Sequence, residues 1–131
     1  MMLTKSLAMP STNKRLESNK IVTMQNRYKW HIPSGRVEFA DSWFISLGYN
    51  PDELPHHVDT WKSLVHPDDM PHIWAELEPC LKGETKKFKA INRLKMKDGS
   101  YRWNLDHGKI VEWDQEGNAV IMEGFDIPLA C

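Results

Sequence analysis

The sequence predicts an α+β fold, in which a five-stranded antiparallel sheet has several short helices packed on one face. Before residue 40 and after residue 83, apolar residues alternate with polar ones, which is typical of strands. Between these regions the apolar residues recur every three or four positions, which is typical of helices. Because the helices form a single block between the strands, we expect them to gather on one side of the sheet.

The first two strands are expected within residues 28–39, where the alternation is interrupted by one turn. Pro33-Ser34-Gly35 supplies turn residues at the centre of the segment. The alternating apolar positions are Tyr28, Trp30 and Ile32 before the turn, and Val37 and Phe39 after it.

Several short helices are predicted in succession. The apolar residues of 40–47 fall on one helical face, and Gly48 follows at a position that favours helix termination. Asn50-Pro51-Asp52-Glu53 has the cap, proline and acids of a helix start, so a second helix is expected there. Asp59 is expected to cap a third.

The longest helix is predicted to begin at Asp68 or Asp69 and to end before Gly83. Pro79 lies inside this pattern, where it removes a backbone hydrogen bond and should kink or shorten the last turn. The residues predicted to face inward are Met70, Ile73, Trp74, Leu77 and Leu81.

The last three strands are predicted to form two hairpins. Asp98-Gly99 indicates a two-residue type I′ turn between the first two of them, and 114–118 contain the second turn. A two-residue turn at 98–99 would place one set of side chains together on the inner face of the sheet: Phe88, Asn92, Leu94, Trp103, Leu105, His107 and Met122. The opposite face is basic, with Lys87, Lys89, Arg93, Lys95 and Lys97.

The composition is that of a soluble globular domain. The chain has 131 residues, and 17 basic against 18 acidic side chains leave a net charge of -1, which gives no global reason to expect nucleic acid or an anionic membrane as partner. Two cysteines make neither a disulfide framework nor a metal-ligand spacing. No apolar run is long enough to insert into a membrane or to act as a signal peptide. We therefore expect a cytoplasmic protein.

Four short motifs, in order, resemble the PAS domain family, and in particular the subgroup with a PAC motif. They are "LGYNPDEL" at 47–54, "WKSLVHPDDM" at 61–70, "KDGSYRW" at 97–103 and "EGFDI" at 123–127. The resemblance covers residues 27–127. The resemblance implies that residues 1–26 are an N-terminal tail or linker helix. It also implies that residues 128–131 are a C-terminal end that leads to an output domain.

The resemblance implies a sensory input and dimerisation module without catalytic activity of its own. PAS domains are commonly joined to histidine kinase, diguanylate cyclase (GGDEF) or phosphodiesterase (EAL) domains, so we expect a homodimer, a covalently attached output domain and a chain that is a fragment. Asp126-Ile127 is similar to the start of the family's terminal Asp-Ile-Thr signature, which passes signals onward. Pro128 stands here in place of the threonine.

A small-molecule pocket is expected on the inner side of the sheet. The predicted lining is Trp43, Trp74, Asn92, Leu94, Trp103, Leu105, His107 and Met122, with Asn92 and His107 as its polar groups. The alternative is that the large rings fill this space as core, which would leave a ligand-free dimerisation module.

Haem, flavin and metal are disfavoured as cofactors. His72, the one histidine of the long helix, lies opposite its apolar stripe, whereas a haem ligand must face the cavity. Cys80 is outside the Asn-Cys-Arg-Phe pattern of flavin-binding LOV domains, although non-covalent flavin binding stays open. His56, His57, His66, Asp68 and Asp69 are explained by a loop and a helix start rather than by a metal site.

The basic strand face raises a nucleic-acid alternative, because lysines in a row can follow a phosphate backbone. The predicted strand register puts no stacking aromatic on that face, however. A solvated sheet face with lysines that discourage edge pairing is the simpler interpretation.

Overall fold

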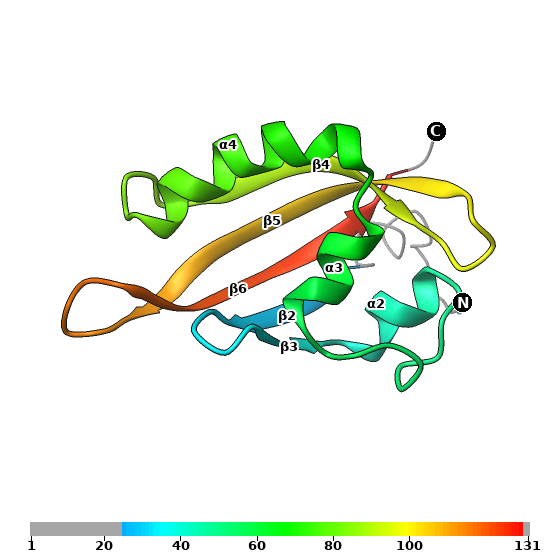
Figure 1. The fold of residues 1–131 in the computed structure, drawn as a ribbon, viewed down its shortest axis with the longest axis horizontal. Helices are drawn as coiled ribbons and strands as arrows, with labels where there is room; N and C mark the ends of the chain where they lie inside the picture. The colour runs from blue at the N-terminus through cyan, green and yellow to red at the C-terminus, as the bar shows by residue number, and fades with distance from the viewer. Residues whose placement is uncertain (1–24, 130–131) are drawn as a thin grey trace, which may run out of the picture.

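The computed structural model describes residues 25–129, and within them five strands form one antiparallel sheet in the order β3-β2-β6-β5-β4 (Figure 1). The strands are β2 (Asn26–His31), β3 (Arg36–Phe39), β4 (Phe88–Lys95), β5 (Tyr101–Trp113) and β6 (Ala119–Pro128). The helices are α2 (Asp41–Ser46), α3 (Val58–Leu64), the 3-10 turn η2 (Pro67–Asp69) and α4 (Met70–Leu81). The predicted fold class is confirmed. Residues 1–26 are interpreted as a tail or linker helix; 1–24 lie outside the described residues, and Asn26 already belongs to β2.

The helices pack against one side of the sheet, which we call the inner face; the other side is the outer face (Figure 1). Strand β4 shows the division clearly, because Phe88, Ala90 and Leu94 are buried while Lys89 and Ile91 between them are exposed. The core therefore lies between the inner face and helices α2, α3 and α4. Among residues 25–129, no helix is long and apolar enough to cross a membrane.

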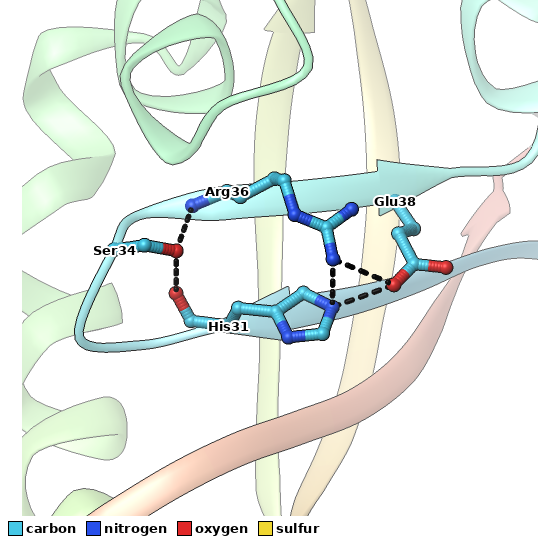
Figure 2. A network of polar contacts seen from close by, with 4 residues as sticks. All are labelled: His31, Ser34, Arg36 and Glu38. Atoms are coloured by element: carbon cyan, nitrogen blue, oxygen red, sulfur yellow. Dashed lines mark hydrogen bonds and ion pairs between the residues drawn. The ribbon is translucent and has the colours of Figure 1, made fainter.

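The first hairpin joins β2 to β3 through the predicted turn at 33–35, where Gly35 adopts a φ of 82°. A cluster of exposed polar side chains binds its two strands together (Figure 2). Nε2 of His31 lies 2.6 Å from Oε2 of Glu38 and 3.0 Å from Nη2 of Arg36. Because this nitrogen either donates to the carboxylate or accepts from the guanidinium, the two bonds alternate. The cluster holds the hairpin together and involves no buried group.

Two of the predicted helix starts are wrong. Residues 51–54 make a single turn, in which the side chain of Glu53 accepts a hydrogen bond from the backbone N–H of Asn50. Pro55 follows at once and disfavours helical backbone at the residue before it. The next helix, α3, is capped by His57 rather than by Asp59, since Nδ1 of His57 accepts from the Asp59 N–H at 3.0 Å.

Helix α4 begins where the sequence predicts, but its capping differs. Nδ1 of His66 accepts the N–H of Asp68 and so caps the preceding turn η2. The carboxylate of Asp69 makes no cap bond to the helix; it accepts from the backbone N–H, Nε and Nη2 of Arg93 on the edge strand β4. Pro79 stays inside the helix, which ends two residues later at Leu81.

The loop between β4 and β5 differs from the predicted two-residue turn by one residue. Met96 N–H donates to Ser100 O at 2.7 Å, and Gly99 N–H donates to Met96 O at 2.9 Å. With Gly99 at a φ of 93°, this is a three-residue loop of the type that places a glycine bulge after the turn. Its extra residue moves every side chain of β5 to the face opposite the predicted one.

Candidate functional site

A cavity of about 270 Å³ lies between the inner face of the sheet and helices α2, α3 and α4. Its wall is almost entirely apolar and contains seven aromatic side chains. It is lined by Tyr28, Trp30, Ile32, Val37, Phe39, Trp43, Val58, Trp61, Lys62, Met70, Ile73, Trp74, Leu77, Leu81, Phe88, Asp106, Met122 and Asp126. A mostly apolar cavity with a few polar groups has the character of a small-molecule site.

The cavity reaches the surface between α3 and α4. Two of its lining residues, Lys62 and Trp74, are exposed, with Trp74 48% accessible. Other lining rings are buried, and among them Phe39 stacks on Trp43 with a centroid separation of 4.1 Å. A ligand that enters between the helices would therefore meet aromatic surface before it reached the sheet.

Two buried carboxyl groups form the polar part of the wall. Asp106 of β5 and Asp126 of β6 are paired directly across the two strands, and both side chains lie on the inner face. The hydroxyl of Tyr28 donates to Oδ1 of Asp106 at 2.9 Å, and Nε1 of Trp43 donates to Oδ2 of Asp126 at 2.5 Å. No N–H or hydroxyl group of residues 25–129 donates to Oδ1 of Asp126, and a hydrogen bond with the Asp106 carboxyl helps to lower the Asp126 pKa.

The pair is held in an environment that favours protonation. Burial, followed by the charge of Asp126, raises the pKa of Asp106 well above its ordinary value. Burial also raises the pKa of Asp126 to about 7, against the opposing effects of the Trp43 hydrogen bond and the Arg102 charge. The hydroxyl pKa of Tyr28 is raised too, chiefly by burial and then by the two carboxyls. Near neutral pH, the pair therefore retains at least one proton, and Asp126 is partly ionised.

Two glycines create the space that Tyr28 occupies. Gly124 pairs with Tyr28 on one side and with Gly108 on the other. A Cβ atom would come within 2.6 Å of the Tyr28 hydroxyl at Gly108 and within 2.5 Å of it at Gly124. The ring can therefore lie across the sheet, and its hydroxyl reaches Asp106.

The structure brings only part of the predicted pocket together. Trp43, Trp74 and Met122 line the cavity. Asn92 and Leu94 are fully buried on the inner face, but they are not among its lining residues. Trp103, Leu105 and His107 lie on the outer face, so the prediction that they face the cavity is wrong. The physical reason is the extra residue of the 97–99 loop, which pairs Arg93 rather than Leu94 with Trp103.

The same shift explains why Asp106, and with it the hydrogen bond from Tyr28, was not predicted as part of the site. With a two-residue turn, Asp106 would face outward as a solvated acid. The signal that could have found it is Gly99 as the last residue of a three-residue loop, a hairpin type nearly as common as the two-residue one. Asp126 was predicted only as a signalling residue and here also lines the cavity.

Asn92 is nonetheless an unusual residue. Its side chain is completely buried, and neither its amide nitrogen nor its oxygen has a partner among the described residues. It pairs across the strands with Asn104, whose oxygen accepts from Nε of Arg102 at 2.9 Å. These amides form a polar strip beside the carboxyl pair.

The residues weighed for haem, flavin and metal have other contacts. Nε2 of His72 is 2.8 Å from the carbonyl oxygen of Ile91, at the edge of the sheet. Cys80 is buried, and burial raises the pKa of its thiol, but it is not a lining residue. His56 stacks on Phe44, while His57 and His66 cap helical turns. No group of three potential metal ligands occurs within residues 25–129.

The outer face combines apolar and basic side chains. Ile91, Leu105 and Ile127 form one row across β4, β5 and β6, and Ile91 is 51% accessible. In the neighbouring row the guanidinium of Arg93 lies 4.9 Å from the centre of the Trp103 ring. On the other side, His107 stacks on Phe125 at 5.3 Å.

Comparison with known proteins agrees with this architecture. The sequence model of the PAS fold matches residues 36–126. The chain belongs to the PAS-fold family.

Several solved PAS-like structures share this fold. The PAS domain described here superposes on a sensory box histidine kinase/response regulator from Burkholderia thailandensis with a TM-score of 0.71, at 21% identity over 88% of this chain and 85% of that one. The N-terminal domain of a diguanylate cyclase with a PAS/PAC sensor from Marinobacter aquaeolei gives 0.68, at 20% identity over 79% and 94%. A light-oxygen-voltage domain studied with a flavin analogue gives 0.61, at 19% identity over 90% and 87%.

A curated relative is a methyl sulfide methyltransferase-associated sensor from Methanosarcina acetivorans. It is 23% identical over 92 residues, which are 70% of this chain. The PAS domain spans only 9% of that relative's length.

Proposed function

We propose that this PAS domain is the sensory input module of a larger signalling protein and that it binds a small molecule in the cavity under the sheet. The observation that carries the proposal is the position of Asp126. Its side chain lines the cavity, accepts the indole N–H of Trp43 from α2, and belongs to the last strand. A ligand at this carboxylate would therefore act directly on β6.

Signal transfer would run along β6. A ligand that competes for Asp126 would weaken or reorient the Trp43 bond and so shift the balance between two arrangements of α2 and the end of β6. Asp126 and Ile127 would then transmit the change to a covalently attached output domain. A histidine kinase or a diguanylate cyclase would fit the relatives, with a phosphodiesterase as a further output type. The PAS domain would regulate that activity without catalysis of its own.

Self-association would use the outer face. Ile91, Leu105 and Ile127 give it an apolar row, and Trp103 adds a partly exposed ring. Burial of such a row against a second copy would stabilise a homodimer by the hydrophobic effect. Cavity and dimer surface would then be the two faces of the same three strands.

The ligand is proposed to be neither haem nor a covalently bound flavin. His72 contacts the sheet edge, away from the cavity lining, and Cys80 is not a lining residue. Non-covalent flavin stays an alternative, because the fold is shared with a light-oxygen-voltage domain and the cavity is rich in aromatic rings.

Native mass spectrometry of the freshly purified chain, with an absorption spectrum of the same sample, tests this function. The expected result is a co-purified small molecule that is lost on denaturation. Absorption bands at about 400–450 nm would identify haem or flavin. Haem, or flavin that stays attached on denaturation, would contradict the cofactor proposal, whereas flavin that is released on denaturation would be the non-covalent alternative. If neither the purified protein nor protein incubated with a metabolite extract carries a bound mass, the ligand-free dimerisation module is correct instead.

One observation favours a second candidate function, nucleic-acid binding by the outer face. The loop shift places Tyr101 and Trp103 on the same face as Lys89 and Lys95, so stacking aromatics do accompany the basic residues. Against this, Arg93 is ion-paired with Asp69, and Lys97 lies in a loop and is ion-paired with Glu53. Filter binding of single-stranded RNA at two salt concentrations decides, because phosphate contacts weaken steeply with salt.

A further inference from the structure

The cavity wall contains one pair of carboxyl groups, besides the buried indole N–H groups of Trp30 and Trp61, which have no partner among the described residues. Asp106 and Asp126 are 4% and 1% exposed, and both line the cavity. Their known donors within the protein are one hydroxyl, from Tyr28, and one indole N–H, from Trp43. Neither donor carries a charge, so the negative charge that the pair retains is not neutralised by these bonds.

No cation of the described residues forms an ion pair with the two carboxyl groups. Arg102 influences Asp126 through its charge, but its own N–H groups donate to Asn104 Oδ1 and to the Ser46 carbonyl oxygen. Lys62 lies at the exposed end of the cavity.

A second observation points from this charge toward a ligand. Oδ1 of Asp126 is buried in the cavity wall, and no N–H or hydroxyl group of the described residues donates to it. A buried carboxylate oxygen without a donor costs on the order of 1–3 kcal/mol, or more when it is charged. A ligand N–H group at this position would remove that cost.

The rest of the wall suits a cation with an apolar body. Trp30, Phe39, Trp43, Trp61 and Trp74 supply aromatic surface around the carboxyl pair. Aromatic faces attract ammonium groups, and the attraction grows when both partners are removed from water. Carboxylate oxygens and aromatic faces together match an ammonium group, and the unpartnered indole N–H groups of Trp30 and Trp61 can donate to an acceptor atom elsewhere on the same ligand.

We infer that the cavity selects a protonated amine with an apolar or aromatic body, whose ammonium group donates to the Asp106–Asp126 pair. This inference rests on the proposed function, because it specifies the ligand class of the same cavity. An anionic ligand head would meet the like charge of the pair, and a neutral head would gain one hydrogen bond but no charge compensation.

Three compounds of matched shape test the ligand class: 2-phenylethylammonium, 2-phenylethanol and 3-phenylpropionate. Binding to the purified chain is measured by isothermal titration calorimetry at a pH of about 7.5, where an aliphatic amine is protonated. The amine is expected to bind at least about tenfold more tightly than the alcohol, since it adds a charge-assisted hydrogen bond and a cation–π contact. The carboxylate is expected to bind most weakly.

Asp126→Asn supplies the decisive variant, because its amide oxygen can still accept from Trp43 while the charge is removed. We expect it to reduce the preference for the amine over the alcohol to less than about threefold, while alcohol binding stays within about twofold and reports an intact cavity. Glu116→Gln removes the same charge from an exposed hairpin residue and should leave the preference unchanged.

Different results would contradict the amine inference and the proposed small-molecule site. Equal binding of amine and alcohol by the natural chain, or an unchanged preference in Asp126→Asn, would overturn the amine inference and leave a small-molecule site in place. If none of the three compounds binds at concentrations up to about 10 mM, the amine inference is wrong, and native mass spectrometry with the metabolite extract decides separately whether the cavity binds another small molecule.

Discussion

Asp106 and Asp126 are two carboxyl groups whose removal from water on folding costs free energy. They are paired across neighbouring strands on the buried face, with Tyr28 and Trp43 as their hydrogen-bond donors. Desolvation and mutual repulsion both oppose a second negative charge there. The pair should therefore make the folding free energy depend on pH.

Asp106→Asn tests this dependence. A carboxyl whose pKa is higher in the folded than in the unfolded chain stabilises the fold fully below the unfolded value of about 3.9. That stability is lost as pH rises through the folded value, which is about 7 for Asp126. Chemical denaturation of the natural protein should show a falling free energy of unfolding between about pH 4 and pH 7.

In Asp106→Asn, the new amide can accept from Tyr28 and donate to Asp126. We expect the fall in stability to be smaller, and the variant to exceed the natural protein by on the order of 2 kcal/mol at about pH 8. Glu116→Gln, at an exposed position, should follow the natural protein. Parallel pH curves for Asp106→Asn and the natural protein would show that the pair is not the titrating unit.

Asn92 allows a second test at the scale of one residue. Its amide is completely buried and unpartnered within the described part of the chain. Asn92→Leu has a similar volume and should therefore raise the free energy of unfolding by about 1 kcal/mol. Asn104→Leu should lower it, because the Arg102 Nε would lose its acceptor. Destabilisation by Asn92→Leu would mean that this amide has a partner.

At the scale of elements, two hairpin loops decide which side chains face the cavity. The β5–β6 loop repeats the bonding of the β4–β5 loop, with Asp114 N–H to Asn118 O and Gly117 N–H to Asp114 O. Gly117 has a φ of 85°, close to the 93° of Gly99. Both loops therefore contain three residues and end on a glycine in the left-handed region.

The length of the β4–β5 loop is the feature that the sequence does not determine. The alternation of Phe88, Ala90 and Leu94 is a local property, and the structure confirms it. The face of Trp103 depends on how many residues the turn contains, and Asp98-Gly99 fits two-residue and three-residue loops alike. Because the loop contains one residue more than predicted, Asp106 of β5 faces the cavity and the predicted pocket residues of β5 face outward.

The helices show a similar limit. The helical period predicted that Trp43 and Trp74 face the cavity, and both line it, although Trp74 is half exposed. Caps were less predictable, because any side chain with an acceptor near the start can fill that role. His57 and His66 cap the helical turns for which aspartates were expected, and Asp69 binds the edge strand through Arg93.

Substitution of Gly99 tests the loop assignment. A Cβ at Gly99 would meet no atom within 4 Å, so the cost of Gly99→Ala comes from the backbone conformation alone. We expect Gly99→Ala to lower the free energy of unfolding by about 1 kcal/mol, and Gly99→Asn by less, because asparagine adopts the left-handed region more readily. Thermal denaturation gives both values, and equal costs would argue against a left-handed residue 99.

For the molecule as a whole, the sheet separates two proposed functions. Its inner face holds the cavity, and its outer face presents Ile91, Leu105 and Ile127 in one row. Because β5 and β6 contribute to both faces, a change at the carboxyl pair and a change in self-association would be linked through the same strands.

Two exposed isoleucines test the proposed dimer surface. Ile91 lies on the outer face and Ile45 on helix α2, with exposed fractions of 51% and 61%. Ile91→Lys should weaken self-association at least about tenfold, since it places a charge in an apolar contact, whereas Ile45→Lys should not change it. Analytical ultracentrifugation measures both. A natural chain that is monomeric at all concentrations, or equal weakening by the two variants, would contradict this interface.

The most direct test of the account is a nitrogen-15 NMR titration of the purified chain with 2-phenylethylammonium. If the amine binds at the carboxyl pair and the change passes along β6, the indole N–H signal of Trp43 and the backbone signals of Asp126 and Ile127 should shift together. The Trp103 indole signal on the outer face should move far less. Shifts confined to Trp103 and its neighbours, or no shifts at saturating amine, would contradict a sensory cavity coupled to the last strand.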